Sequence, residues 1–557
     1  MHDILFRNAQ IFDGTGGPPV AGDVAVENGR IARPSGPARE TIDAGGLALM
    51  PGIIDSHTHF DAQITWDPYV RPSPELGVTT AVIGNCGFAI APCKPQHRDI
   101  TMRNLTQVEG MSLEVLKAGV AWEFETFPEY LAQLKRRGCA VNIAAYVGHS
   151  SVRTWVMGED ASRRAATDAE IGEMQAIVRE AMQAGAVGFA SSTSPAHNGE
   201  GGLPMPSRLA DERETRALVK AMSETGRGVY MLTKGAQTSL AFLESLAADS
   251  GRPVMVAALL HNGTNPRAVF DDLEAIAAAN ARGHVLIGQV SCCPLTMDFT
   301  MQSPYPVEGL ASWKSALGLR GGELKTELAK HDFRDGVRAE LATRSHFRLF
   351  NGEWDKVQVV EAVRHARYEQ RTLADIAAAE SRDPLDVMLD LALAENLQTI
   401  FTAQLLNSDE EAVGRMLTHP HSIVSLSDAG AHLTFFNDAG FGLHLMGHWA
   451  RERGAMTMSD AVRRLTSHPA QVFGMRRRGA IREGCAADLL LFDPQTVGRG
   501  RKRRVFDLPG GAPRLTTDAV GVHGVWVNGR MVADGDGLVG SAPLEGEMLT
   551  DFSVGGG

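Results

Sequence analysis

The sequence predicts an α/β fold in which a parallel (β/α)8 barrel is combined with a small β domain built from both ends of the chain. Through the middle of the chain, strand-like apolar runs alternate with helical stretches, which is typical of a parallel sheet covered by helices. Both ends consist instead of short strands and turns. The 557 residues are enough for one large barrel with additional segments.

The two chain ends share a strand-and-turn pattern. An Asn-Gly dipeptide, which favours a hairpin turn, occurs at residues 28–29 and again at residues 528–529. Short apolar runs flank both dipeptides. We therefore expect residues 1–50 and 476–557 to form one β domain, with residues 51–475 forming the barrel.

Eight candidate barrel strands can be placed between these ends. Each is an apolar run, and they end near His59, Cys86, Val147, Ser191, Thr233, Ala258, Val290 and Ser427. The intervening helices are clearest at residues 169–184, where apolar residues recur at helical spacing. Residues 295–398 are too long for one connection between a strand and a helix, so we expect a helical insertion or lid there.

The composition limits the partners and the compartment that we expect. The 54 basic and 66 acidic residues give a formal net charge of −12, which argues against nucleic acid or an anionic membrane as the main partner. No apolar run approaches the roughly 18–20 residues that span a bilayer, and the first twenty residues do not resemble a signal peptide. Six cysteines are sparse for a disulfide framework. We expect a soluble, cytoplasmic protein.

A His-x-His pair follows the first candidate barrel strand. Residues two apart on a strand point to the same face, so His57 and His59 can hold one metal ion together. The carboxyl ends of the strands are also where parallel barrels place their active sites. The alternative is two histidines with structural roles at the end of a strand.

A carboxylate ends the last candidate strand, at Ser427-Asp428. Asp428 could ligate the same metal ion and accept a proton from a metal-activated water molecule. The alternative is that Asp428 caps the N-terminus of a following helix.

Together these segments resemble the amidohydrolase superfamily, and within it the D-aminoacylase (N-acyl-D-amino-acid deacylase) branch. The resemblance spans nearly the whole chain and includes residues 51–59, 77–80, 84–87, 146–150, 188–192, 427–432, 466–470 and 484–489. It implies a TIM barrel with a β-sandwich from both termini and a divalent metal, usually zinc. It also implies hydrolysis of amide bonds, commonly those of N-acylated D-amino acids.

The resemblance further implies which residues bind the metal. By position, His57, His59 and Asp428 correspond to the first metal site. Cys86 lies where the D-aminoacylase branch uses a cysteine to bind or bridge metal, and a thiolate is a suitable zinc ligand. The alternative for Cys86 is an inert, buried apolar side chain.

Two positions depart from the family's pattern. The family has a histidine at the end of the fifth strand and another at the end of the sixth. Here Lys234 lies near the first of these positions and Ala258 at the second, while His261 follows three residues later. A second metal held by two histidines is therefore not expected, which leaves one metal ion per chain.

Three roles are open for Lys234. Its ammonium group could supply the charge of the missing metal, it could be carbamylated and act as a ligand, or it could point to solvent. We favour the first role and count Lys234, with Asp428, as catalytic. Replacing Lys234 by Met is then expected to abolish most turnover while metal content is kept.

The expected activity is the hydrolysis of a non-peptide amide by metal-activated water, with an N-acyl-(D-)amino acid as the leading substrate. Hydrolysis of a cyclic amide, imide or lactone is one alternative, and a non-hydrolytic isomerase or lyase is another. A third is a catalytically dead barrel that serves as a binding or assembly subunit. The sequence leaves a homo-oligomer open.

The substrate pocket is expected to include residues that follow other barrel strands. His149, Arg153 and His432 are the substrate-binding candidates, although each histidine is also compatible with a structural role. An arginine would suit a substrate carboxylate because of its bidentate fit, and Arg208 is a further candidate by location.

Overall fold

The computed structural model describes residues 1–343, 348–540 and 542–553. The chain divides into two compact units, which are described separately below. The first comprises residues 1–259, 272–292 and 414–557, and the second comprises residues 260–271 and 293–413. Within the described residues, no helix is both long and apolar enough to cross a membrane.

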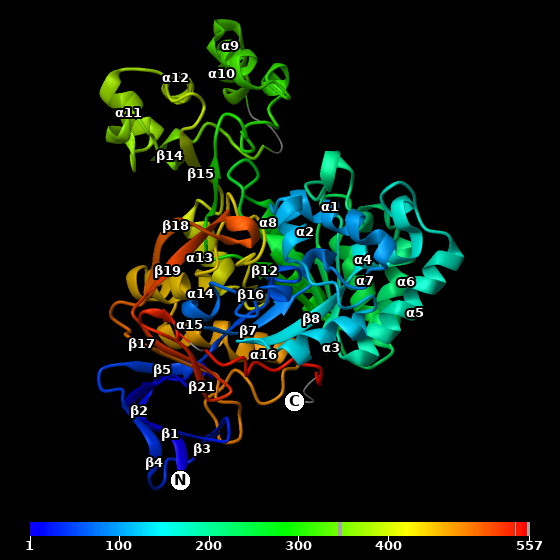
Figure 1. The fold of residues 1–557 in the computed structure, drawn as a ribbon, viewed down its shortest axis with the longest axis vertical. Helices are drawn as coiled ribbons and strands as arrows, with labels where there is room; N and C mark the ends of the chain where they lie inside the picture. Colours follow the sequence, from blue (N-terminus) through cyan, green and yellow to red (C-terminus); the bar gives the residue numbers. More distant parts are fainter. Residues whose placement is uncertain (344–347, 541, 554–557) are drawn as a thin grey trace. The chain divides into compact units, whose positions relative to one another are not determined.

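The first unit contains a sheet of eight parallel strands, as the sequence predicts (Figure 1). The strand order is β16-β12-β11-β10-β9-β8-β7-β6, so that neighbours in the sheet are also consecutive barrel strands along the chain. The strands are β6 (Ile53–Asp55), β7 (Val78–Ile83), β8 (Asn142–Gly148), β9 (Gly188–Ser192), β10 (Val229–Thr233), β11 (Val254–Leu259), β12 (Leu286–Val290) and β16 (Ser422–Val424). Nearly all their side chains are buried, as expected for a sheet covered on both faces.

The ends of the first and last strands meet and close the barrel. Just beyond β6 and β16, Thr58 and Ala429 form a parallel bridge, and the backbone N–H of His59 donates to the carbonyl oxygen of Ala429 at 2.7 Å. The hydroxyl of Ser56 donates to the Ser425 hydroxyl oxygen at 2.8 Å. This closure brings the segment that carries His57 and His59 beside the segment that carries Asp428.

Amphipathic helices connect these strands. Helix α5 confirms the predicted helix at residues 169–184: a capping box between Thr167 and Glu170 starts it, Gly185 ends it at φ 112°, and its apolar side chains are buried. The helices of this unit include α1 (Arg98–Val108), α2 (Leu113–Gly119), α3 (Phe127–Arg137), α4 (His149–Met157), α5 (Asp168–Ala184), α6 (Glu212–Ser223), α7 (Leu240–Ser250), α14 (Phe441–His444), α15 (Met458–Leu465) and α16 (Ser467–Phe473). Helices α8 (Ala268–Ala281) and α13 (Glu410–Thr418) each begin in the second unit and end in the first.

The two ends of the chain form one nine-stranded mixed sheet. In Figure 1, the blue N-terminal strands and the orange to red strands β17 and β21 belong to it. Strand β5 joins the two ends, because it pairs in parallel with β1 and antiparallel with β17. The rings of Phe6 and Trp526 pack edge to face at 4.9 Å in its core. The strands are β1 (His2–Ile11), β2 (Val20–Glu27), β3 (Arg30–Ala32), β4 (Ala38–Asp43), β5 (Ala48–Pro51), β17 (Leu489–Phe492), β20 (Val522–Val527), β21 (Arg530–Asp534) and β22 (Gly537–Leu538).

Two smaller sheets were not predicted from the sequence. A hairpin of β18 (Gly498–Leu508) and β19 (Ala512–Val520) belongs to the first unit. In the second unit, β13 (Leu295–Phe299), β15 (Ile400–Leu406) and β14 (Val357–Glu361) form an antiparallel sheet. The helices of that unit are α9 (Gly321–Ala329), α10 (His331–Leu341), α11 (Leu373–Glu380) and α12 (Pro384–Ala394). The expected helical insertion at residues 295–398 thus falls within a mixed α/β segment.

Candidate metal and active site

Three potential metal ligands converge at the carboxyl ends of the first two barrel strands. His57 and His59 follow β6, and Cys86 lies in the turn after β7. The Sγ atom of Cys86 is 3.4 Å from Nε2 of His57 and 3.9 Å from Nε2 of His59. One donor atom from each of the three residues lies within 4.8 Å of the others, and all three side chains are buried. No other such group of three is found among the described residues.

Asp428 brings a carboxylate to the same point. Its Oδ1 atom is 3.2 Å from Nε2 of His57 and 3.6 Å from Nε2 of His59. Barrel closure explains this approach, because Asp428 immediately precedes Ala429, the bridge partner of Thr58. The structure therefore brings together all four residues that the sequence identifies as ligand candidates.

The outer ring nitrogens of both histidines have partners of their own. Nδ1 of His57 lies 2.8 Å from Oε1 of Gln289, and Nδ1 of His59 lies 3.2 Å from Oε1 of Glu109. An acceptor at Nδ1 favours the proton there and leaves the Nε2 lone pair for a metal ion. Neither Gln289 nor Glu109 belongs to a recognisable motif, so their contacts with the histidines could not be predicted from the sequence.

The electrostatics of the cluster also suit a metal ion. Burial opposes ionisation of the Cys86 thiol, but His57 and His59 beside it lower its pKa to about 7. Burial likewise opposes the charged form of Asp428, but the two histidines lower the pKa of its carboxyl group below the usual range. Two imidazoles, a thiolate and a carboxylate make a donor set that suits zinc and similar divalent ions.

Several site residues adopt a strained backbone. Cys86, Asp428 and His432 have φ values of 56°, 47° and 54°, in the left-handed region that non-glycine residues seldom occupy. Such strain concentrates at functional sites, where the surrounding structure holds it in place. Here it turns each side chain toward the same cavity.

The four candidate ligands line a cavity of about 70 Å³. Its remaining wall combines apolar side chains, one threonine and two further histidines: Phe88, Val108, His197, Thr233, Ala258, Leu426 and His432. His432 is a predicted substrate-binding residue, and its buried Nδ1 atom has no hydrogen-bond partner among the described residues. Nδ1 of His197 lies 2.7 Å from the Ser192 hydroxyl, and burial lowers the pKa of His197 to about 3, so its ring is neutral.

The fifth and sixth strands present Thr233 and Ala258 to this cavity. The Oγ1 atom of Thr233 is 3.1 Å from Sγ of Cys86, whereas Nζ of Lys234 pairs with Oδ2 of Asp272 in α8 at 3.1 Å. Successive residues of a strand face opposite sides, so the inward position of Thr233 sends Lys234 outward to the helix layer. The geometry therefore does not support the catalytic role expected for Lys234.

Replacing Lys234 by Met is now expected to leave kcat and metal content unchanged, because the ammonium group is paired away from the cavity. Steady-state kinetics on the metal-loaded variant would check this. A large fall in kcat with full metal content would restore the catalytic role of Lys234.

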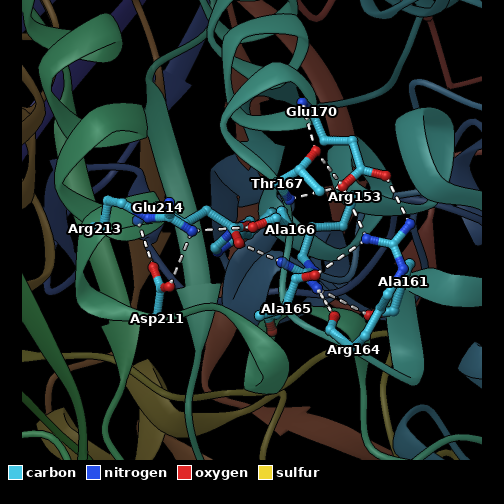
Figure 2. Close-up of polar contacts among 12 residues, drawn as sticks. Arg153, Ala161, Arg164, Ala165, Ala166, Thr167, Glu170, Asp211, Arg213 and Glu214 are labelled. Atoms are coloured by element: carbon cyan, nitrogen blue, oxygen red, sulfur yellow. Dashed lines mark hydrogen bonds and ion pairs between the residues drawn. The ribbon is translucent and has the colours of Figure 1, made fainter.

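His149 and Arg153 are also displaced from their expected role. Both are fully buried in a polar network around Glu214 of α6, and neither lines the cavity. Figure 2 draws polar contacts of Arg153, Glu214 and residues near them. Nε2 of His149 lies 2.8 Å from Oε1 of Glu214, its Nδ1 lies 2.8 Å from the Ser191 hydroxyl, and Arg153 donates to the other Glu214 oxygen. Arg153 also donates to the carbonyl oxygen of Arg164 at 2.8 Å. With both ring nitrogens of His149 and both terminal amino groups of Arg153 engaged in this way, these two side chains anchor α4 to α6 and are not placed to bind substrate.

Replacing Glu214 by Ala is expected to lower the free energy of unfolding by about 3–5 kcal/mol, because it leaves the Arg153 charge buried and uncompensated. Urea denaturation would measure the change. Glu212, exposed on the same helix, is the control, and its replacement by Ala should change stability by less than about 0.5 kcal/mol. Equal stability of the two variants would show that the network is dispensable.

Two other candidates lie apart from the cavity lining. His261 belongs to the second unit, where its backbone N–H donates to Oδ1 of Asn407 at 2.7 Å. Arg208 donates to the carbonyl oxygen of His197 at 3.1 Å, but it is not part of the cavity wall.

Comparisons with known proteins agree with this geometry. The model of the Amidohydrolase family matches residues 40–533. The N-acyl-D-aspartate deacylase of Alcaligenes xylosoxydans xylosoxydans is 28% identical over 545 residues, covering 96% of this chain and 92% of that protein. The D-aminoacylase of the same organism is 28% identical and covers 95% and 94%.

The fold is shared over the full length of solved relatives. The N-acyl-D-glutamate deacylase of Bordetella bronchiseptica, solved with zinc and a phosphonate inhibitor, matches 99% of this chain and 100% of its own. The sequence identity is 26% and the TM-score is 0.66. With the family match and the His-His-Cys cluster, these comparisons show that the chain belongs to the amidohydrolase family and is a metal-dependent hydrolase of carbon–nitrogen bonds.

Proposed function

We propose that this protein removes the acyl group from N-acyl-D-amino acids, with one zinc ion held by His57, His59, Cys86 and Asp428. The observation that carries the proposal is the convergence of two Nε2 atoms, one Sγ atom and one carboxylate oxygen at the mouth of the barrel. The deacylase names of its relatives support the substrate class. Residues 51–475 would form the catalytic domain, and residues 1–50 with 476–557 the supporting β domain.

A metal ion bound here would polarise the amide carbonyl and lower the pKa of a water molecule towards neutrality. Asp428 is ionised and lies beside the Nε2 atoms of both histidines, so its carboxylate can accept a proton from the attacking water. It would then pass that proton to the leaving nitrogen. His432, with its unpartnered Nδ1 atom, is placed to hydrogen-bond the substrate.

One observation favours a second candidate, the hydrolysis of an uncharged amide such as a cyclic amide or imide. Among the described residues that line the cavity, none is a lysine or an arginine. Lys234 and Arg153 pair instead with Asp272 and Glu214. The cavity wall therefore offers no guanidinium or ammonium group to a substrate carboxylate.

A substrate panel tests both candidates. Hydrolysis would be measured as amine release from N-acetyl-D-amino acids, their L-enantiomers and the matching uncharged carboxamides. For a cyclic imide it would be measured as formation of the ring-opened acid, because that reaction releases no amine. The main proposal expects hydrolysis of the D-acids, lost on chelation and restored by zinc. Turnover of only the uncharged compounds would select the second candidate, and a lack of chelator-sensitive hydrolysis would contradict both. Location in the cytoplasm, self-association and the lack of a nucleic-acid partner stay predictions.

A further inference from the structure

The second ring nitrogen of His59 faces a buried carboxylate. Oε1 of Glu109 lies 3.2 Å from Nδ1 of His59, on the side of the ring opposite Cys86 and Asp428. Glu109 follows directly after α1, and it is only 3% exposed. It therefore contacts the ring from outside the ligand cluster.

The buried carboxylate of Glu109 has few partners besides the ring of His59. Its Oε2 atom is buried and has no hydrogen-bond partner among the described residues. A buried carboxylate is costly unless it is paired, and His59 is the partner that the structure provides. If this position served only to stabilise the fold, an apolar side chain would be more favourable there. The presence of a carboxylate therefore indicates a role at the metal site.

The residues on either side of Glu109 fix its position. Val108 lines the cavity. Gly110 has a φ of 62°, and a Cβ atom there would come within 3.1 Å of the Cα of His432. The segment 108–110 thus packs against the cavity on one side of Glu109 and against the His432 loop on the other.

We propose that Glu109 is a positioning residue, which holds the proton of His59 on Nδ1 and so presents Nε2 as a metal donor. This inference rests on the proposed metal site. Gln289 occupies the same place at His57, but its amide oxygen is neutral. Outer partners of this kind orient the ligating ring, and their loss commonly weakens metal binding.

Zinc affinity of the full-length protein tests the proposal, measured by competition with a chelator. We expect Glu109→Ala to bind zinc about 10–100-fold more weakly than the wild type. Glu109→Gln keeps an acceptor oxygen and should lose less. The visible spectrum of the cobalt-loaded protein, which reports the geometry of the thiolate and imidazole donors, should change in Glu109→Ala.

Glu395 offers a matched control, because it is a buried glutamate paired with a histidine in the second unit. Its Oε1 atom lies 2.5 Å from Nδ1 of His365. Glu395→Ala is expected to keep the zinc affinity and the cobalt spectrum of the wild type. If Glu109→Ala fails to fold, Glu109→Leu, which fills the site with an apolar side chain but has no acceptor oxygen, carries the test.

The outcomes separate this inference from the proposed function. Folded Glu109 variants with wild-type zinc affinity and an unchanged cobalt spectrum would overturn the positioning role. A wild-type protein that binds no zinc would instead overturn the metal site itself.

Discussion

Replacing Asp428 by Asn is expected to lower kcat by about 10²–10⁴-fold, the range that proton transfer by a positioned side chain contributes. The amide keeps the size of the side chain but cannot accept a proton from water. Steady-state kinetics at saturating zinc would measure the loss, with bound zinc determined on the same sample so that weakened binding is recognised.

Asp438 provides the control for this substitution. It is a buried aspartate in the same region, but its Oδ1 atom pairs with Arg499 at 2.8 Å and it does not line the cavity. Asp438→Asn should therefore keep most of the wild-type kcat. An Asp428→Asn protein that binds zinc and turns over at the wild-type rate would show that another group accepts the proton.

Replacing Cys86 by Ala is expected to weaken zinc binding by more than about 100-fold, because loss of a ligand should exceed the 10–100-fold effect of losing an outer partner. Activity at limiting zinc should fall in parallel. Chelator competition on the purified variant would give the affinity.

Cys93 is the matched control, since it is a second buried cysteine in the same connection after β7. Its thiol contacts the Thr101 hydroxyl at 3.4 Å and does not line the cavity. Cys93→Ala should bind zinc like the wild type. Equal affinity in Cys86→Ala and Cys93→Ala would remove Cys86 from the ligand set.

The barrel and three of the ligand candidates, His57, His59 and Asp428, were predictable because their signals are local, whereas Cys86 was identified through the family resemblance. A buried parallel strand is a short apolar run, and its end is marked by the polar residues that follow, as at His57 and Asp428. Parallel strands end at one edge of the sheet, so locating these ends also indicated which side chains would meet.

Predictions failed where a side chain's direction depended on register or on distant partners. Lys234 and Thr233 are adjacent in sequence, and a one-residue difference decides which of them faces the cavity. His149 and Arg153 follow a barrel strand, but both side chains pair in the protein interior with Glu214, which lies more than sixty residues away in the sequence. Glu109 and Gln289 were missed for the same reason, since only tertiary structure places them beside the histidines.

The small sheet of the second unit was missed for a different reason. Its strands lie far apart in the sequence, because about a hundred residues, with several helices and strand β14 among them, separate β13 from β15. The prediction for this segment rested on its length, which indicates an insertion but does not locate short strands within it.

The metal content of the purified wild-type protein tests the central claim most directly. Inductively coupled plasma mass spectrometry, with protein concentration measured on the same sample, is expected to find about one zinc ion per chain after loading and removal of excess metal. Two ions per chain would contradict the single site formed by His57, His59, Cys86 and Asp428. No bound metal above a chelator-treated blank would contradict the metal centre altogether.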